Sequence, residues 1–230
     1  METPLIGILA GMGPRSTAPF VDLVVSECQR QYGAKDDPDF PAMMIYSLPT
    51  PFYPGRALDH AAMEDTLHAG LRRLERAGAD FMAIACNTAH VYYPQLAGRA
   101  AVPLLDMVAL AVDALPPSTR TVAVIAARPT IESAIYQQAI AGRGIACVDP
   151  LWQAGVDSLI ELLHDPVGPA LLTARWTDLE NAAKAAGADT ILVACADLSA
   201  ASVALDTLVV DATHCLAREL VAEWLRRKPA

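Results

Sequence analysis

The 230-residue sequence has few basic residues, with 17 lysines and arginines against 26 aspartates and glutamates and a formal charge of −9. Nucleic-acid-binding surfaces are usually strongly basic, so this balance argues against a nucleic-acid partner. The two small basic clusters, Arg72-Arg73 and Arg226-Arg227-Lys228, are typical of solvated helix faces.

Long hydrophobic runs are also absent, although 53% of the residues are hydrophobic. No stretch reaches the roughly 18 uninterrupted apolar residues of a membrane span, which argues against a membrane partner. The beginning, METPLIGILAGMGP, lacks the basic region and the long apolar region of a signal peptide. We therefore expect a cytoplasmic protein whose core fills one domain or two small ones.

Cysteine is present in an odd number, five, and no C-x-x-C pair occurs. Free thiols in a reducing compartment are expected, and with histidines scattered along the chain no metal site is predicted. The turn Gly11-Met12-Gly13-Pro14 does not extend to G-x-G-x-x-G, and no G-K-S/T sequence is present. Neither a nucleotide nor a dinucleotide cofactor is therefore indicated.

Apolar runs of strand length alternate with segments of helical periodicity. This alternation is typical of an α/β fold in which parallel sheets are flanked by helices. A turn is expected at Arg128-Pro129, and Pro94 is expected to kink or divide its helix. The predicted strands are residues 5–9, 42–46, 81–85, 121–126, 145–148, 190–194 and 208–210; the main predicted helices are 16–31, 59–77, 88–99, 156–164, 169–186 and 211–227.

The pattern restarts in the second half of the chain. GADFMAIAC at 78–86 and GADTILVAC at 187–195 share five of nine residues, and Asp106 aligns with Asp211 in the segments that follow. GILAGMGPRST near the start also roughly matches AVIAARPTIES. Three matches in one order indicate a duplicated α/β unit. We predict two pseudosymmetric lobes, residues 1–104 with 209–230 and residues 105–208, with the active site between them.

Cys86 and Cys195 occupy matching positions of this repeat, each at the end of a predicted strand and the start of a helix. Ligands of open α/β sheets bind outside the carboxyl ends of strands, and a helix N-terminus lowers a thiol pKa. A single cysteine there would fit equally well as a small buried apolar residue, but the repetition favours a functional pair. Cys28, Cys147 and Cys215 lack this support and are expected to pack in the core.

Two thiols in one cleft permit the inversion of a stereocentre without a cofactor. One thiolate removes a proton from carbon and the other thiol delivers a proton to the opposite face. The carbanion needs positioned donors in a dry cavity. Asn87 and Thr88 are N-cap residue types that either only cap the next helix or also anchor a substrate carboxylate.

The motifs together resemble the cofactor-independent aspartate/glutamate racemase family, within the Asp/Glu/hydantoin racemase superfamily. CNTAH at 86–90 is the most specific of them, supported by the GMGP turn, the T-I-E-S-x-x-Y run from Thr130 and the second G-A-D block. The resemblance covers nearly the whole chain. It implies two α/β lobes, a homodimer, no cofactor, and Cys86 and Cys195 as acid/base residues that each serve one enantiomer.

The same resemblance implies a set of substrate-binding residues. Asn87, Thr88 and Thr130 match positions that hold the α-carboxylate and amino group, and Met12 lies beside the substrate. Arg56 matches the arginine that grips a side-chain carboxylate, to which its planar fork is suited, although a solvated loop arginine is the alternative.

Two positions depart from the family pattern. Ala196-Asp197 replaces the usual Thr-Glu after the second cysteine, with Asp197 keeping an acidic group there. His164 replaces a lysine that assists with the distal carboxylate, unless it is an ordinary helix-end histidine. We predict a racemase for L- and D-aspartate, with glutamate next. A malonate-type decarboxylase of the same fold and a catalytically silent amino-acid-binding homologue remain as alternatives.

Overall fold

The computed structural model describes residues 3–53, 58–163, 165, 168–199 and 208–228. The chain divides into two compact units, the first formed by Met1–Asp106 with Leu216–Ala230 and the second by Met107–Cys215. The expected lobes differ from this division at residues 105–106, which fall in the first unit, and over the longer segment 209–215. The segment 209–215 falls in the second unit because Val209, Val210 and Asp211 pair with the preceding strand of the second sheet.

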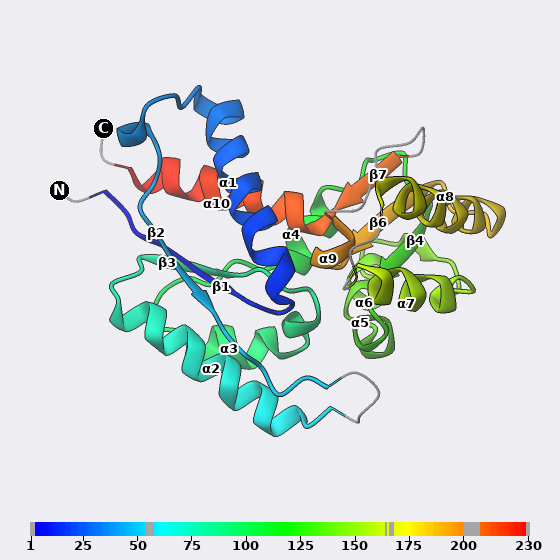
Figure 1. The fold of residues 1–230 in the computed structure, drawn as a ribbon, viewed down its shortest axis with the longest axis horizontal. Coiled ribbons are helices and arrows are strands. Elements are labelled where there is room, and N and C mark those ends of the chain that lie inside the picture. Colours follow the sequence, from blue (N-terminus) through cyan, green and yellow to red (C-terminus); the bar gives the residue numbers. More distant parts are fainter. Residues whose placement is uncertain (1–2, 54–57, 164, 166–167, 200–207, 229–230) are drawn as a thin grey trace. The chain divides into compact units, whose positions relative to one another are not determined.

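The first unit is built on a three-stranded parallel sheet with strand order β2-β1-β3. Its central strand is buried along its whole length, as expected for a strand covered on both faces. Helices α1 and α10 lie on one face of the sheet, and α2 and α3 on the other (Figure 1). The elements are β1 (Ile6–Ala10), α1 (Thr17–Tyr32), β2 (Met43–Ser47), α2 (His60–Arg76), β3 (Phe81–Ile84), α3 (Tyr93–Arg99) and α10 (Ala212–Arg227), with 3₁₀ turns η1 (Pro14–Ser16), η2 (Asp37–Asp39) and η3 (Thr88–Tyr92).

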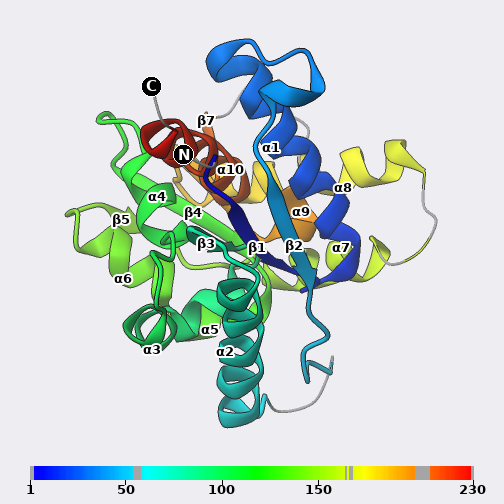
Figure 2. The ribbon, with the colours of Figure 1, turned by 90° about the vertical axis from the view of Figure 1, so that its left-hand side faces the viewer.

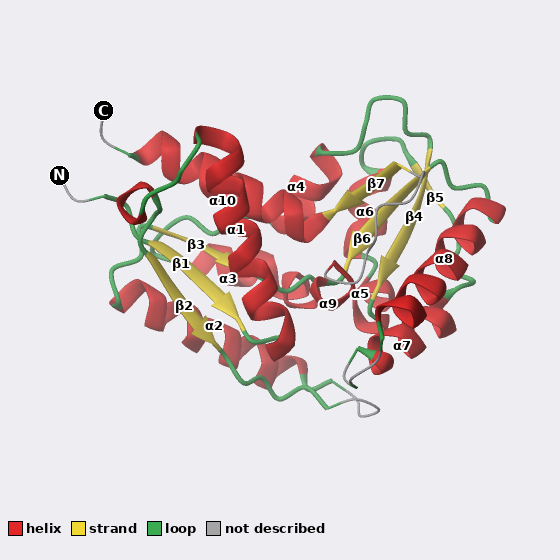
Figure 3. Cartoon of the chain, turned by 45° about the horizontal axis from the view of Figure 1, so that its top comes forward, coloured by secondary structure: helices red, strands yellow, loops and turns green. Residues whose placement is uncertain are grey.

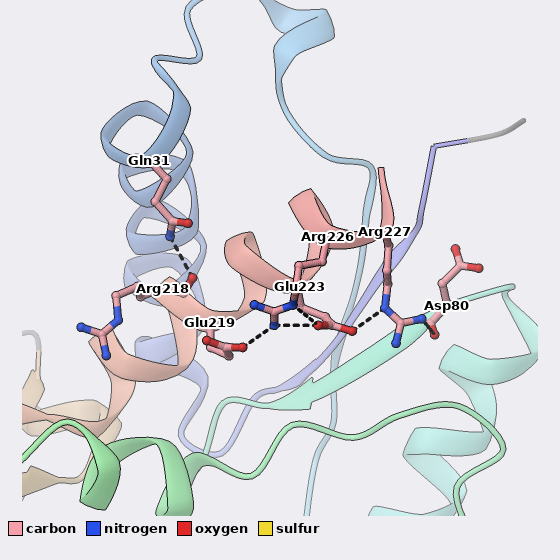
Figure 4. Close-up of polar contacts among 7 residues, drawn as sticks. All are labelled: Gln31, Asp80, Arg218, Glu219, Glu223, Arg226 and Arg227. Carbon is pink, nitrogen blue, oxygen red and sulfur yellow. Dashed lines mark hydrogen bonds and ion pairs between the residues drawn. The ribbon is translucent and has the colours of Figure 1, made fainter. Parts of the chain in front are cut away.

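The last helix is tied to the first unit by polar contacts along one side (Figure 4). Gln31 Nε2 donates to the Arg218 carbonyl at 2.8 Å. Arg227 Nη1 donates to the Asp80 carbonyl at 3.5 Å, and within α10 Arg226 forms ion pairs with Glu219 and Glu223. Arg227 lies over the Phe81 ring, 5.2 Å from its centroid. The basic cluster at the end of α10 is therefore engaged in ion pairs and ring contacts, beyond the simple solvation expected from the sequence.

The second unit contains a four-stranded parallel sheet with order β5-β4-β6-β7. Helices α4 and α6 pack together on one face, and α7 and α8 on the other (Figures 2 and 3). The elements are α4 (Met107–Asp113), β4 (Thr121–Ala126), α5 (Arg128–Ser133), α6 (Ile135–Ala141), β5 (Ala146–Cys147), α7 (Gln153–Leu162), α8 (Pro169–Ala185), β6 (Thr190–Ala194), α9 (Ala196–Ser199) and β7 (Leu208–Asp211).

The repeated G-A-D sequences form the same helix-to-strand turn in both units. Gly78 and Gly187 follow α2 and α8 with φ of +89° and +91°, the left-handed conformation that favours glycine after a helix. The aspartate then fixes the neighbouring central strand: Asp80 Oδ2 accepts from Leu5 N at 2.7 Å, and Asp189 Oδ2 from Arg120 N at 2.8 Å. Two of the five repeated identities, the glycine and the aspartate, thus serve folding at the amino end of a strand, opposite to the cysteine.

The structure confirms the expectation for one proline, Pro94, and contradicts the expectation for another, Pro129. Pro94 divides its segment as expected, because a 3₁₀ turn precedes it and α3 begins one residue before it. The turn expected at Arg128-Pro129 is wrong: both residues begin α5, where proline in the first turn costs no helical hydrogen bond. The chain instead breaks at Ala134, whose φ is 56°.

Among the helices of the described residues, none combines the length and apolar character that crossing a bilayer requires.

Candidate active site

Cys86 lies just beyond the carboxyl end of β3, at the edge of the first sheet where β1 also ends. Ala85 N donates to the Leu9 carbonyl at 2.9 Å, which extends the pairing of the two strands up to the cysteine. Cys86 is 9% exposed and belongs to the hydrophobic cluster between the sheet and α2. Met12 packs against the same cluster from the turn that follows β1. The structure thus brings these two predicted site residues to one sheet edge.

The turn that carries Met12 depends on a glycine. Gly11 has φ of +93°, and a Cβ atom there would lie 2.6 Å from Leu48 N, so no larger residue fits. Gly11 N donates to Thr17 Oγ1 at 3.1 Å, and Ser16 Oγ donates to the Gly13 carbonyl at 2.8 Å. The turn is thereby closed against the start of α1.

Asn87 and Thr88 follow the cysteine directly, and the former is buried at 2% exposure while the latter is partly exposed. Asn87 precedes η3, but its side chain makes no hydrogen bond that caps this turn. Asn87 therefore does not act merely as a helix cap, which is one of the two roles expected for it. The segment after Cys86 begins as a 3₁₀ turn rather than as the single helix expected over residues 88–99.

His90, the last residue of CNTAH, lies behind the cysteine at 2% exposure. Its Nδ1 donates to the Cys86 carbonyl at 2.8 Å, and its ring stacks on Tyr93 at 5.7 Å. Burial lowers the pKa of His90 below its ordinary value of 6.5, against the opposing effects of the Cys86 carbonyl, the Asp106 carboxylate and the Leu105 carbonyl. The ring is therefore a neutral group that holds the backbone of the cysteine.

Cys195 occupies the corresponding place in the second unit, directly after β6 and before the short helix α9. It is 8% exposed and contributes to the hydrophobic cluster under α7 and α8. Its strand neighbour, β4, ends in register, because Ala126 pairs with Ala194. Thr130 lies four residues beyond Ala126 in α5 and is 1% exposed. Both predicted site residues thus follow the carboxyl ends of adjacent strands.

The remaining predicted residues divide into two groups. Asp197 lies in α9, two residues after Cys195, and is partly exposed. Arg56 and His164 lie outside the described residues. Within the described ranges, no three or more His, Cys, Asp or Glu side chains gather so that they could hold a metal ion.

Two of the other three cysteines fit the core packing expected for them, whereas Cys147 is only partly buried. Cys28 is fully buried in α1 and Cys215 is buried in α10, while Cys147 lies in the short edge strand β5. Burial raises the pKa of the Cys28 and Cys147 thiols, which opposes formation of a thiolate. All five cysteines, each of which falls in a described range, are thiols rather than halves of a disulfide.

Comparison with known proteins matches residues 9–220 to the Asp/Glu/Hydantoin racemase family. The chain belongs to this family. It is 41% identical to the broad specificity amino-acid racemase RacX of Bacillus subtilis over 96% of this chain and 98% of that protein. These relationships support an isomerase of the amino-acid racemase type.

Solved structures with the same fold come from several racemases. The aspartate racemase of Picrophilus torridus superposes with a TM-score of 0.83 at 22% identity, covering 98% of this chain and 96% of that one. An aspartate racemase homologue from Pyrococcus horikoshii gives 0.77 at 20% identity, covering 97% and 100%. The α/β fold with two parallel sheets flanked by helices is thereby confirmed.

Sequence reasoning missed three residues around this racemase's two cysteines. In the sequence His90 stands out only as part of a motif, whereas its ring contacts the Cys86 backbone. Ser199 and Asp211 have no predicted role, although the hydroxyl and the carboxylate lie close together in the second unit. The signal was present in the spacing, because both His90 and Ser199 stand four residues after a cysteine of the repeat.

Proposed function

We propose that this protein is a cofactor-independent amino-acid racemase in which Cys86 and Cys195 act on opposite faces of the substrate's α-carbon. One cysteine, as thiolate, removes the α-proton, and the other, as thiol, protonates the carbanion from the other side. When the opposite enantiomer is bound, the roles exchange. The net reaction moves protons only, so no redox partner is needed.

The observation that carries this proposal is the equivalence of the two cysteines. Each follows a buried parallel strand of a repeated unit, and each is less than one-tenth exposed. Ligands of parallel α/β sheets bind at this edge. A cysteine that served packing alone would not need the same position in both copies. We further propose that the two edges face one substrate, with Met12, Asn87 and Thr88 from the first unit and Thr130 and Asp197 from the second.

The buried polar side chains suit the anchoring of an α-carboxylate and α-amino group. Asn87 and Thr130 are 2% and 1% exposed, so water competes little for their hydrogen bonds. Withdrawing charge from the α-carbon through the carboxylate is the main requirement for forming the carbanion.

Acidic amino acids are our first proposed substrates, aspartate before glutamate, with Arg56 and His164 on the distal carboxylate. This choice rests on the family resemblance alone. The 41% identical relative is named for broad specificity, so the substrate panel must extend to uncharged and basic amino acids.

The decisive test is exchange of the α-hydrogen in deuterium oxide, followed by NMR or mass spectrometry for each enantiomer of each amino acid. Wild-type protein should incorporate deuterium and invert configuration with at least one amino acid. Cys86→Ser and Cys195→Ser should each abolish inversion, and Cys28→Ser is the matched control in a cysteine assigned to packing. Absence of exchange with every amino acid would refute the proposal.

The same samples separate the two alternatives. Release of carbon dioxide from a substituted malonate would indicate the decarboxylase, which needs only one of the cysteines. Thermal stabilisation by an amino acid without exchange would indicate the silent homologue.

We also propose a homodimer, on the basis of the family resemblance. A cytoplasmic location is proposed because the five cysteines form no disulfide in the described residues. Light scattering coupled to size exclusion should give twice the chain mass of 24.4 kDa. Edge strand β2 leaves Met44 and Ile45 exposed at 42% and 38% and is our candidate contact. Ile45→Lys should then yield monomers, whereas Leu151→Lys, at another exposed apolar residue, should not.

A further inference from the structure

The carbonyl of each candidate catalytic cysteine is hydrogen-bonded to the residue four positions later, and that residue lies near an aspartate from a neighbouring segment of the same unit. In the first unit, His90 Nδ1 donates to the Cys86 carbonyl at 2.8 Å, and the ring lies within electrostatic reach of Asp106. In the second unit, Ser199 N donates to the Cys195 carbonyl at 3.0 Å. Burial raises the pKa of the Asp211 carboxyl, and the Ser199 side chain lies close enough to this group to lower that pKa in part.

The two aspartates stand at equivalent backbone positions. Met82 of β3 forms a parallel bridge with Leu104, two residues before Asp106. Ile191 of β6 pairs in parallel with Val209, two residues before Asp211. Met82 and Ile191 are each four residues after the glycine of the G-A-D turn. The same strand register therefore delivers an aspartate beside the cysteine turn in both units.

The aspartate of the second unit is itself fixed by the backbone. Its Oδ1 accepts from Thr213 N at 2.8 Å and from His214 N at 3.2 Å, as an N-cap of the 16-residue helix α10. A carboxylate held by two backbone donors cannot shift without disturbing the helix start. The Ser199 side chain thus lies beside a fixed carboxylate, while Ser199 N holds the Cys195 carbonyl.

We infer that His90 with Asp106, and Ser199 with Asp211, are positioning pairs that set the direction of the Cys86 and Cys195 thiols for the two half-reactions. This inference rests on the two-cysteine racemase proposed above. Neither pair touches the reacting atoms in this scheme; each acts through the backbone of its cysteine. Since a shift of about 1 Å in a reacting group can cost roughly 100-fold in rate, loosening a pair is expected to matter.

The pairs make a prediction that general destabilisation does not. Weakening one cysteine raises the barrier for the proton transfer in which that cysteine takes part. For the enantiomer that this cysteine deprotonates, the α-deuterium isotope effect on kcat/KM should rise. For the other enantiomer the isotope effect should fall. The unaffected cysteine removes the α-deuterium there, and reprotonation by the weakened cysteine limits the rate instead. Variants of the two pairs should therefore shift the isotope effects in opposite senses.

The experiment compares His90→Leu with Ser199→Ala, and both with wild type. Each should lower kcat/KM by roughly 10- to 100-fold. His90→Asn, whose amide nitrogen can replace Nδ1 as donor to the Cys86 carbonyl, should recover most of the loss, and so should Ser199→Thr for the second pair. His68→Asn and Ser158→Ala, on α2 and α7, are matched controls. Isotope effects that move in the same sense in both variants, or in neither, overturn the inference.

A second readout does not need racemase activity. The alkylation rate of each cysteine by iodoacetamide, followed by mass spectrometry of its peptide, should change several-fold at Cys86 in His90→Leu and at Cys195 in Ser199→Ala. The other cysteine in the same molecule reports on folding and should keep its rate. Equal changes at both thiols, or none, contradict the pairs. Local changes in a protein that racemises no amino acid would refute the proposed function while the pairs stand as supports of the thiols.

Discussion

Removing the imidazole of His90 should change how the stability of the protein depends on pH. Burial lowers the pKa of His90 below 6.5 in the folded protein, whereas in the unfolded chain the ring titrates near 6.5. Below that pH the unfolded chain therefore binds a proton that the folded protein does not. The free energy of unfolding must fall as the solution is acidified.

The size of this effect follows from the linkage relation. If the folded ring stays neutral, the unfolding free energy lost between about pH 7.5 and about pH 5.5 is about 1.4 kcal/mol for this one group. His90→Asn keeps a donor toward the Cys86 carbonyl but cannot take up the proton. Its stability loss over the same interval should be smaller than that of wild type by about this amount, whatever its absolute stability.

Urea unfolding followed by circular dichroism at both pH values gives the four free energies required. His68→Gln, which removes an imidazole from helix α2, is the matched control and should keep the wild-type difference between the two pH values. NMR titration of the imidazole carbons gives the His90 pKa directly. Parallel pH profiles for wild type and His90→Asn, or a His90 ring that titrates at or above 6.5, would refute the reasoning.

Further predictions concern three glycines and the hydrogen bond between Asp80 and Leu5 N, called here the strand clamp. Gly187→Ala meets no neighbouring atom, but its φ of +91° should cost about 1–2 kcal/mol in urea unfolding, whereas Gly98→Ala, in open space within α3, should gain about 0.5–1 kcal/mol. Gly7→Ala would place Cβ 2.8 Å from the Ala79 Cβ and should lower the unfolding free energy by about 1–3 kcal/mol. Asp80→Ala removes the acceptor for Leu5 N and should cost about 1–3 kcal/mol, with faster hydrogen exchange along β1 as the local sign; unchanged exchange there would contradict the clamp.

Much of the secondary structure could be predicted because the strands are short and apolar throughout. The strand over 121–126 and the strand over 190–194 agree with β4 and β6 residue for residue. Both are buried on two faces, so their hydrophobic runs are continuous and end sharply at polar turns. The repeat in the sequence likewise locates the two cysteines at strand ends, because it aligns one G-A-D-strand-A-C block with the other.

The errors came from signals that local sequence leaves ambiguous. Pro129 breaks a helix in its interior but begins one in its first turn, and only the hydrogen bonds of α5 decide between the two. Residues 209–211 are predicted for the first lobe because their strand is short and nothing in the sequence identifies its partner. Pairing with β6 assigns them to the second unit.

The sequence by itself determined the α/β class, the duplication and the pair Cys86 and Cys195, since periodicity, glycine turns and repeated motifs are properties of the chain. Only the tertiary structure decided what lies behind each thiol. His90 and Asp106 are sixteen positions apart, and Ser199 and Asp211 twelve, so the proximity within neither pair follows from local patterning. Parallel pairing of β3 with the Leu104 segment and of β6 with β7 brings each aspartate to its cysteine turn. Strand register, which depends on the packing of a whole sheet, is what the sequence did not reveal.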